Sequence, residues 1–62
     1  MEILYSDKNI AVCIKPVGLD SEMEVPNALK EALGGEIFPI HRLDKNVGGV
    51  MVYARNKQAL HP

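Results

Sequence analysis

The sequence predicts an α+β fold with at least one β-hairpin and one short helix. Three observations predict it. Two β-prone runs, residues 3–5 and 10–14, flank a cluster of turn-forming residues. An amphipathic run over residues 26–33 starts at a proline and stops before two glycines, and residues 49–54 are almost entirely apolar. The predicted order is strand, strand, helix, short strand, loop and strand.

The first two strands are predicted to form a hairpin. Residues 6–9, Ser-Asp-Lys-Asn, form a cluster rich in turn formers and separate the two β-prone runs. Pro16 and Gly18 then end the second strand, because proline donates no hydrogen bond to a ladder and glycine permits a tight turn.

A helix is predicted to begin at Pro26, where the N–H that proline lacks would have no partner in any case. Its apolar stripe comprises Val25, Leu29, Ala32 and Leu33. Gly34 and Gly35 end the helix by supplying a positive φ. Residues 21–24 match the S-x-x-E capping-box pattern, but a helix that started there would carry Pro26 in its interior, so the later start is favoured.

The second half of the chain is predicted to add two strands and the start of a helix. Residues 37–38 form a short extended piece that Pro39 breaks. Residues 49–54 contain almost no polar side chain, which predicts a strand buried on both faces. Asn56 is the expected N-cap of a helix that begins at Lys57.

Length, charge and cysteine content exclude several classes of protein. A chain of 62 residues forms at most one small domain. Cys13 is the only cysteine, so no intramolecular disulfide forms, and it is expected to be a small buried apolar side chain. No Cys/His spacing suggests a metal site, and no apolar run approaches the ~20 residues of a membrane span. The expected location is the cytoplasm. With a net charge of −1, the chain lacks the excess of basic residues that is typical of a protein that binds RNA by itself.

The residues that could carry chemistry lie in the stretch HRLDKNVGG, just before the last predicted strand. Arg42 and Asp44 are two positions apart and could share one face of the chain. They could form a surface ion pair worth ~0–1 kcal/mol. They could instead be a catalytic carboxylate and an arginine that orients it or binds an anionic substrate. The glycines at 48 and 49 could serve close backbone approach or a turn with positive φ. Spacing alone leaves these alternatives open.

Two motifs of the chain resemble those of the RluA-type pseudouridine synthases. The stretch HRLDKNVGGVMVYAR is similar to the family pattern H-R-L-D-x-x-T-S-G-L-L-x-x-A. The matching positions are His41, Arg42, Leu43, Asp44, Gly49 and Ala54. Upstream, ILYSDKNIAVCIKPVGL resembles the family's two strands followed by K-P-x-G-L, with matches at Lys15, Pro16, Gly18 and Leu19. The resemblance extends from residue 3 to about residue 60.

The resemblance implies an RNA pseudouridine synthase, an isomerase that converts uridine to pseudouridine in rRNA or tRNA without a metal or an organic cofactor. Asp44 aligns with the family's essential aspartate, which acts as a nucleophile or assists abstraction of a ribose proton. Arg42 aligns with an arginine linked to flipping the target nucleotide, and His41 would shape the loop or contact RNA. Lys15 is expected to be structural rather than catalytic.

The chain departs from the family pattern at two points. Val47 and Gly48 stand where the family has Thr-Ser, so two hydroxyls that could brace the loop around Asp44 are missing. The family's later motifs, a tyrosine near the uracil and a basic residue near the aspartate, have no counterpart here, and Tyr53 is expected in the core. The resemblance implies that the α+β fold is the N-terminal portion of a mixed, mainly antiparallel pseudouridine-synthase-like sheet with one short helix. Residues 1–62 are therefore expected to be a partial catalytic domain, incomplete at its C-terminus and inactive in isolation.

One alternative remains open at this stage. The chain could be a non-enzymatic remnant or a small interaction protein that associates with itself or with a complementing chain, because exposed sheet edges favour such pairing. The sequence does not say which RNA, or which uridine, would be the substrate.

Overall fold

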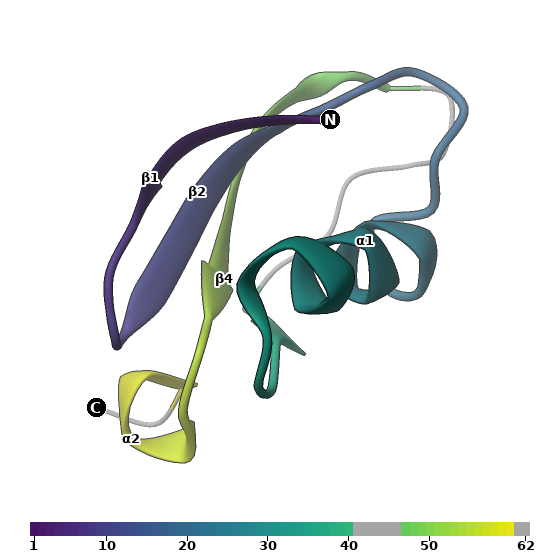
Figure 1. Ribbon diagram of the computed structural model, residues 1–62. Coiled ribbons are helices and arrows are strands. Elements are labelled where there is room, and N and C mark those ends of the chain that lie inside the picture. Colours follow the sequence, from purple (N-terminus) through teal and green to yellow (C-terminus); the bar gives the residue numbers. More distant parts are fainter. Residues whose placement is uncertain (41–46, 61–62) are drawn as a thin grey trace.

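The computed structural model describes residues 1–40 and 47–60, which form a four-stranded sheet with one helix across one of its faces (Figure 1). The elements are β1 (Glu2–Ser6), β2 (Ile10–Lys15), α1 (Glu24–Leu33), β3 (Phe38–Pro39), β4 (Gly49–Ala54) and α2 (Lys57–Leu60). The strand order is β1-β2-β4-β3, and each described pair is antiparallel. The predicted α+β class is confirmed.

The predicted hairpin forms, and one carboxylate organises its turn. Asp7 Oδ1 accepts hydrogen bonds from the backbone N–H of Ile10 at 2.9 Å and of Asn9 at 2.7 Å, while Oδ2 accepts one from the Tyr5 hydroxyl at 2.7 Å. These donors, the Ile10 N–H first among them, hold the pKa of Asp7 below its ordinary value, because they stabilise the charged form. The same contact raises the pKa of Tyr5. The turn is therefore fixed by a side chain as well as by the ladder.

The core lies between α1 and the face of the sheet that α1 covers. Pairing of β2 with β4 in the register Cys13↔Met51 and Ala11↔Tyr53 brings alternate side chains of both strands to this face. Its buried members are Ala11, Cys13, Val25, Leu29, Ile37, Met51 and Tyr53. Burial raises the pKa of the Cys13 thiol, and the expectation that this cysteine is a buried apolar side chain is confirmed.

The prediction that the strand at 49–54 is buried on both faces is wrong. Met51 and Tyr53 are buried, but Val50 on the opposite face is 59% exposed. Ile14, its partner in the register, is also exposed. The cause is the layering: α1 packs on one face only, and none of the described elements covers the other (Figure 1).

Helix α1 begins earlier than predicted, at Glu24 rather than at Pro26. Pro26 is accommodated as the third helical residue, because the first four N–H groups of a helix have no intrahelical acceptor. The Glu24 carboxylate accepts a hydrogen bond from the Asp20 N–H at 3.3 Å, and Asp20 Oδ1 accepts one from the Glu22 N–H at 2.9 Å. Glu24 of the S-x-x-E pattern thus accepts a hydrogen bond from a preceding backbone N–H, as the glutamate of a capping box does, but the donor is Asp20 instead of Ser21.

The rest of the predicted helix is largely confirmed. Val25 and Leu29 are buried and Leu33 packs at the margin of the core, whereas Ala32 is exposed. Gly34 follows the last helical residue with φ 79°, and its N–H donates to the Lys30 carbonyl at 2.8 Å. This positive φ is the reason that the helix ends at a glycine.

The short third strand includes the proline that was expected to break it. Phe38 pairs with Ala54 and Pro39 with Tyr53. A proline is tolerated here because β3 is a two-residue strand at the edge of the sheet, where one side of the backbone needs no ladder partner.

Two side chains just after β4 join segments that are distant in sequence. Arg55 donates from Nη1 to the Asp7 carbonyl at 2.9 Å and from Nη2 to the Leu33 carbonyl at 3.3 Å, which connects the hairpin turn to the end of α1. Asn56 Oδ1 accepts a hydrogen bond from the Ala59 N–H at 2.8 Å, so the predicted N-cap is confirmed. No helix within the described ranges is long and apolar enough to cross a membrane.

Tyr53 anchors the segment before α1 to the centre of the sheet. Its ring is fully buried, as expected of a core residue, and its hydroxyl donates to the Ser21 carbonyl at 2.7 Å. Burial raises the pKa of Tyr53 to about 12.

We expect Tyr53→Phe to lower the free energy of unfolding by about 1–3 kcal/mol, because it removes a donor to a buried carbonyl. Tyr5→Phe is the matched control, since the Tyr5 hydroxyl bonds an exposed carboxylate. It should change stability by less than about 0.5 kcal/mol. Urea unfolding followed by circular dichroism measures both, and equal losses would contradict this account of Tyr53.

The raised pKa of Tyr53 also predicts a pH dependence. Because the folded-state pKa is about 12 and the ordinary value is 10.0, the unfolded state loses the phenolic proton first. The stability that this group contributes is fully present below pH ~10 and is lost as the pH rises to ~12. The free energy of unfolding of the wild type should fall more steeply over this window than that of Tyr53→Phe. If the free energies of unfolding of the wild type and of Tyr53→Phe fall equally over this window, the pKa of Tyr53 is not raised in the folded state and the prediction is wrong.

Candidate active site

The three residues predicted to carry function, His41, Arg42 and Asp44, lie outside the described residues. The structure describes both flanks of their segment, Ile40 on one side and Val47 with Gly48 on the other. The structural description of the candidate active site is therefore limited to these flanks.

The sheet sets where the flanks lie. Strand β3 pairs with the second half of β4, through Pro39 and Tyr53, whereas β4 begins at Gly49. Residues 40–48 therefore join the end of β3 to the beginning of β4. Gly49 lies opposite Lys15, the last residue of β2. The K-P-x-G-L motif and the segment that follows Asp44, about thirty positions apart in the chain, are thus brought together at one end of the sheet (Figure 1).

Lys15 connects the two motifs directly. Its side chain is fully buried, and Nζ donates to the Val47 carbonyl at 2.5 Å and to the Pro16 carbonyl at 3.2 Å. A buried ammonium requires acceptors, because removing a charge from water is costly unless hydrogen bonds replace the lost hydration. The structure agrees with the expectation that Lys15 is structural, and it identifies Val47 as a backbone partner that sequence reasoning did not find.

Gly48 allows the two segments to approach closely. A Cβ at this position would lie 3.1 Å from the Lys15 carbonyl oxygen and 3.2 Å from Cγ2 of Val17. Both distances are tighter than ordinary van der Waals contact. Of the two roles considered for the glycine pair, close backbone approach is therefore the one that applies at Gly48.

The described part of the chain holds no group of three or more His, Cys, Asp or Glu side chains that could bind a metal ion. Every buried side-chain nitrogen and oxygen among the described residues has a hydrogen-bond partner. Among the described residues, the two motifs are joined by the hydrogen bond from Lys15 to Val47 and by the close approach of Gly48 to Lys15 and Val17.

Comparisons with known proteins agree with this arrangement. The model of the RNA pseudouridylate synthase family matches residues 9–61. The tRNA pseudouridine synthase C of Vibrio cholerae is 34% identical over 94% of this chain, and the dual-specificity RNA pseudouridine synthase RluA of Vibrio vulnificus is 37% identical over 94%. The solved structure of human RNA Pseudouridylate Synthase Domain Containing 4 superposes with a TM-score of 0.74 at 36% identity over 97% of this chain. The chain belongs to the RNA pseudouridylate synthase family.

These relatives are much longer than the chain. It spans 28% of the Vibrio cholerae protein, 26% of the Vibrio vulnificus protein and 26% of the human chain. Family membership and fold follow from the matched residues.

We expect Gly48→Ala to destabilise the chain. The added methyl group overpacks the contact with Lys15 and Val17, which costs about 1–3 kcal/mol and outweighs the ~0.4–1 kcal/mol that alanine gains by restricting the unfolded chain. In a Val17→Ala background the loss should shrink, because one of the two close neighbours is then smaller. Thermal unfolding of the four variants in this cycle measures the coupling. A gain of stability in Gly48→Ala would contradict the close approach.

Proposed function

We propose that the chain is the aspartate-bearing part of an RNA pseudouridine synthase, with Asp44 as its catalytic residue. The observation that supports this most directly is the meeting of the two family motifs, where Lys15 of one donates to Val47 of the other. Val47 lies three positions after Asp44. The proposed catalytic residue is thus three positions in the sequence from a backbone group that a buried side chain binds, and precise chemistry is usually placed on such rigid supports.

The proposed reaction breaks the bond between uracil N1 and ribose C1′ and forms a new one between C5 and C1′, while C5 loses its hydrogen as a proton and N1 gains a proton. Asp44 would act at the ribose or the base, as a nucleophile or in proton abstraction. Arg42 and His41 would contact RNA, with Arg42 filling the place of the flipped nucleotide. The reaction needs no metal or organic cofactor on this proposal.

The substrate class is RNA, which the family implies, and tRNA or rRNA is the proposed kind. The names of the relatives favour tRNA, since one acts on tRNA and another is a dual-specificity enzyme. The chain's net charge of −1 indicates that the basic surface for RNA would come from elsewhere in a complete enzyme. A cytoplasmic location is part of the proposal.

Residues 1–62 are proposed to supply one part of a catalytic domain and to be inactive alone. A carboxylate becomes reactive only among preorganised partners, and the relatives are several times longer than this chain.

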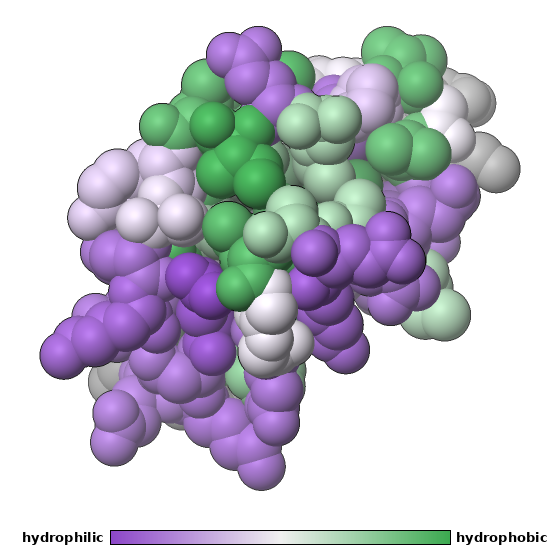
Figure 2. Space-filling model, in the orientation of Figure 1, coloured by the Kyte–Doolittle hydropathy of each residue, from purple (hydrophilic) through white to green (hydrophobic). Residues whose placement is uncertain are grey.

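A second candidate function, an interaction protein, is favoured by one observation. The face of the sheet opposite α1 exposes apolar side chains, with Val50 59% and Tyr5 53% exposed, which suits association with a second copy or with a complementing chain. Apolar surface is also plain on the face seen in Figure 2.

The proposal is tested by grafting residues 1–62 in place of the aligned segment of the Vibrio cholerae relative and measuring tritium release from tRNA that contains 5-³H-uridine. The graft should release tritium, because C5 loses its hydrogen when it bonds to the ribose. Asp44→Ala should reduce release by at least about 10³-fold. Asp20→Ala is the matched control and should retain activity within about threefold, since the Asp20 carboxylate accepts a hydrogen bond from the Glu22 N–H in the turn before α1.

The same assay on the 62-residue chain alone should show no release. Release that depends on Asp44 would contradict the proposed inactivity of the isolated chain. An active graft that is insensitive to Asp44→Ala would overturn the assignment of the catalytic residue.

A further inference from the structure

We propose that the face of the sheet opposite α1 is the docking surface for the polypeptide that completes the catalytic domain. We call this surface the open face, and it is made of the side chains of Tyr5, Val12, Ile14, Val50 and Val52. The inference rests on the proposed function, because it takes the chain to be one part of a larger domain. It names the surface that joins this part to the remainder, and it makes the remainder, rather than a second copy, the occupant.

Strand register places these five side chains on one surface. Val12 lies opposite Val52, Ile14 lies opposite Val50, and Tyr5 lies opposite Val12 on the other side of β2. The residues that alternate with them in β2 and β4 belong to the core under α1. Val50 is 59%, Tyr5 53% and Ile14 38% exposed, and Val12 and Val52 are half-buried. Because directly opposite side chains are close neighbours, the five form one continuous apolar surface.

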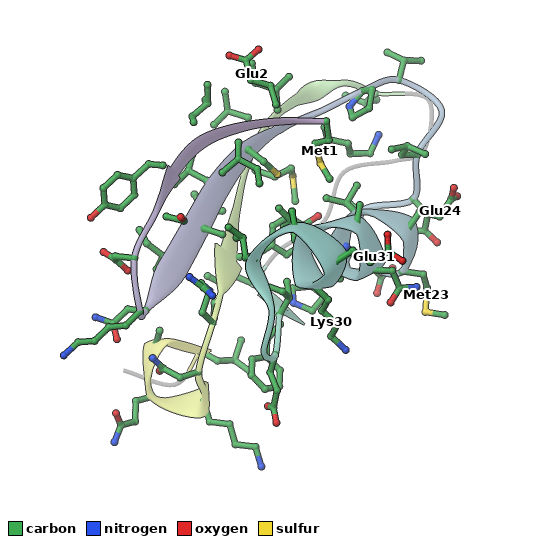
Figure 3. All side chains as sticks on the ribbon, viewed as in Figure 1. Met1, Glu2, Met23, Glu24, Lys30 and Glu31 are labelled. Atoms are coloured by element: carbon green, nitrogen blue, oxygen red, sulfur yellow. The ribbon has the colours of Figure 1, made fainter. Side chains whose placement is uncertain are left out.

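The composition of β2 and β4 is that of strands with neighbours on both faces. An antiparallel sheet with one face in water alternates apolar and polar side chains. Residues 10–14 and 50–54 contain no charged side chain, so this alternation is absent. Helix α1, by contrast, carries Glu24, Lys30 and Glu31 at exposed positions (Figure 3). The helix therefore has the surface of an element in contact with water, whereas the open face does not.

The length of the relatives identifies the occupant. The human structure shares the fold of this chain over 97% of its residues, and the shared part is 26% of the human chain. The match to the Vibrio cholerae relative covers 28% of that protein. More than two thirds of each relative is thus polypeptide outside the shared part and joined to it covalently. Tethered polypeptide has a high effective concentration at a neighbouring apolar surface, so it competes favourably against a second copy.

The chemistry of the open face disfavours RNA as its occupant. Affinity for RNA comes mainly from cations that neutralise phosphates. None of the five side chains carries a charge, and Glu2, which lies opposite Ile14 at the edge of the face, is negative. Such a surface gains free energy when other apolar side chains displace its water. The occupant should therefore present an apolar stripe of its own, such as one side of an amphipathic helix.

The first experiment asks whether the open face becomes inaccessible in a complete domain. Cysteine replaces Val50 in the 62-residue chain and in the graft described above, and its reaction with a maleimide is followed by peptide mass spectrometry. We expect Val50→Cys to react at least about 100-fold more slowly in the graft, because a covered thiol reacts only when the structure opens locally. Met23→Cys is the matched control, since Met23 is 65% exposed and lies at the start of α1. Its rate should agree within about threefold in the two proteins.

Equal rates for Val50→Cys in the chain and the graft would overturn the inference, as would equal protection of Val50→Cys and Met23→Cys. Protection in the 62-residue chain that grows with its concentration would assign the open face to a second copy and would also overturn it. If the graft does not fold, the residue of the unmodified Vibrio cholerae protein that aligns with Val50 is replaced by cysteine, and protection there decides the question.

The second experiment measures thermal unfolding of both proteins with Ile14→Lys/Val50→Glu. The new side chains lie opposite each other and have opposite charges, so the Tm of the 62-residue chain should change by less than about 3 °C. The Tm of the graft should fall by at least about 5 °C, because there the ion pair loses its water. Met23→Glu/Asn27→Lys, an opposite-charge pair at exposed positions of α1, is the matched control and should leave the Tm of the graft nearly unchanged. Equal shifts of Tm in the chain and the graft would overturn the inference.

These measurements separate the inference from the proposed function, because neither requires catalysis. An inactive graft in which Val50→Cys is protected would count against the proposed function and would support the docking surface. An active graft in which Val50→Cys stays reactive would support the proposed function and would overturn the docking surface.

Discussion

The antiparallel pairing of β2 with β4 is the constraint on which the rest of the structure depends. Its register places Cys13 opposite Met51 and Ala11 opposite Tyr53, so that these side chains face α1 together. The same register sets Lys15 opposite Gly49, which brings the turn after β2 against the end of the Asp44 segment. A shift by one residue would send every inward side chain to the open face and would separate the two motifs. The core and the described residues that follow Asp44 are therefore positioned by one set of backbone hydrogen bonds.

Polar side chains strengthen a core that is small even for a single domain. A chain of this size buries only about 60% of its unfolded surface, and it has no disulfide to compensate. Asp7 closes the hairpin, Arg55 joins that hairpin to the end of α1, and Tyr53 joins the sheet to the segment before α1. Each bond ends on a backbone group, so each fixes the path of the chain rather than pairing two mobile side chains.

Sequence reasoning predicted the elements whose signals are local. Turn formers located the hairpin, Gly34 the end of α1 and Asn56 the cap of α2, because each acts on neighbouring backbone. Sequence reasoning failed where the packing of helix on sheet decides which side chains are buried. Val50 is apolar and yet exposed, because α1 covers only the opposite face of the sheet. For the site, the resemblance to the family motif named His41, Arg42 and Asp44, but no pattern in the sequence indicates that the Lys15 ammonium reaches the Val47 carbonyl. Such a contact follows from strand register, which a single sequence does not reveal.

The central claim is that the β2–β4 register holds the turn at residues 15–18 against the backbone that follows Asp44. A nuclear Overhauser experiment on the 62-residue chain tests it most directly. We expect cross-peaks between the Lys15 ε-methylene and the α-protons of Val47 and Gly48, and between a Val17 methyl group and Gly48, together with cross-strand peaks that place Lys15 opposite Gly49. A folded chain with β2 and β4 paired in another register, and without these cross-peaks, would contradict the account.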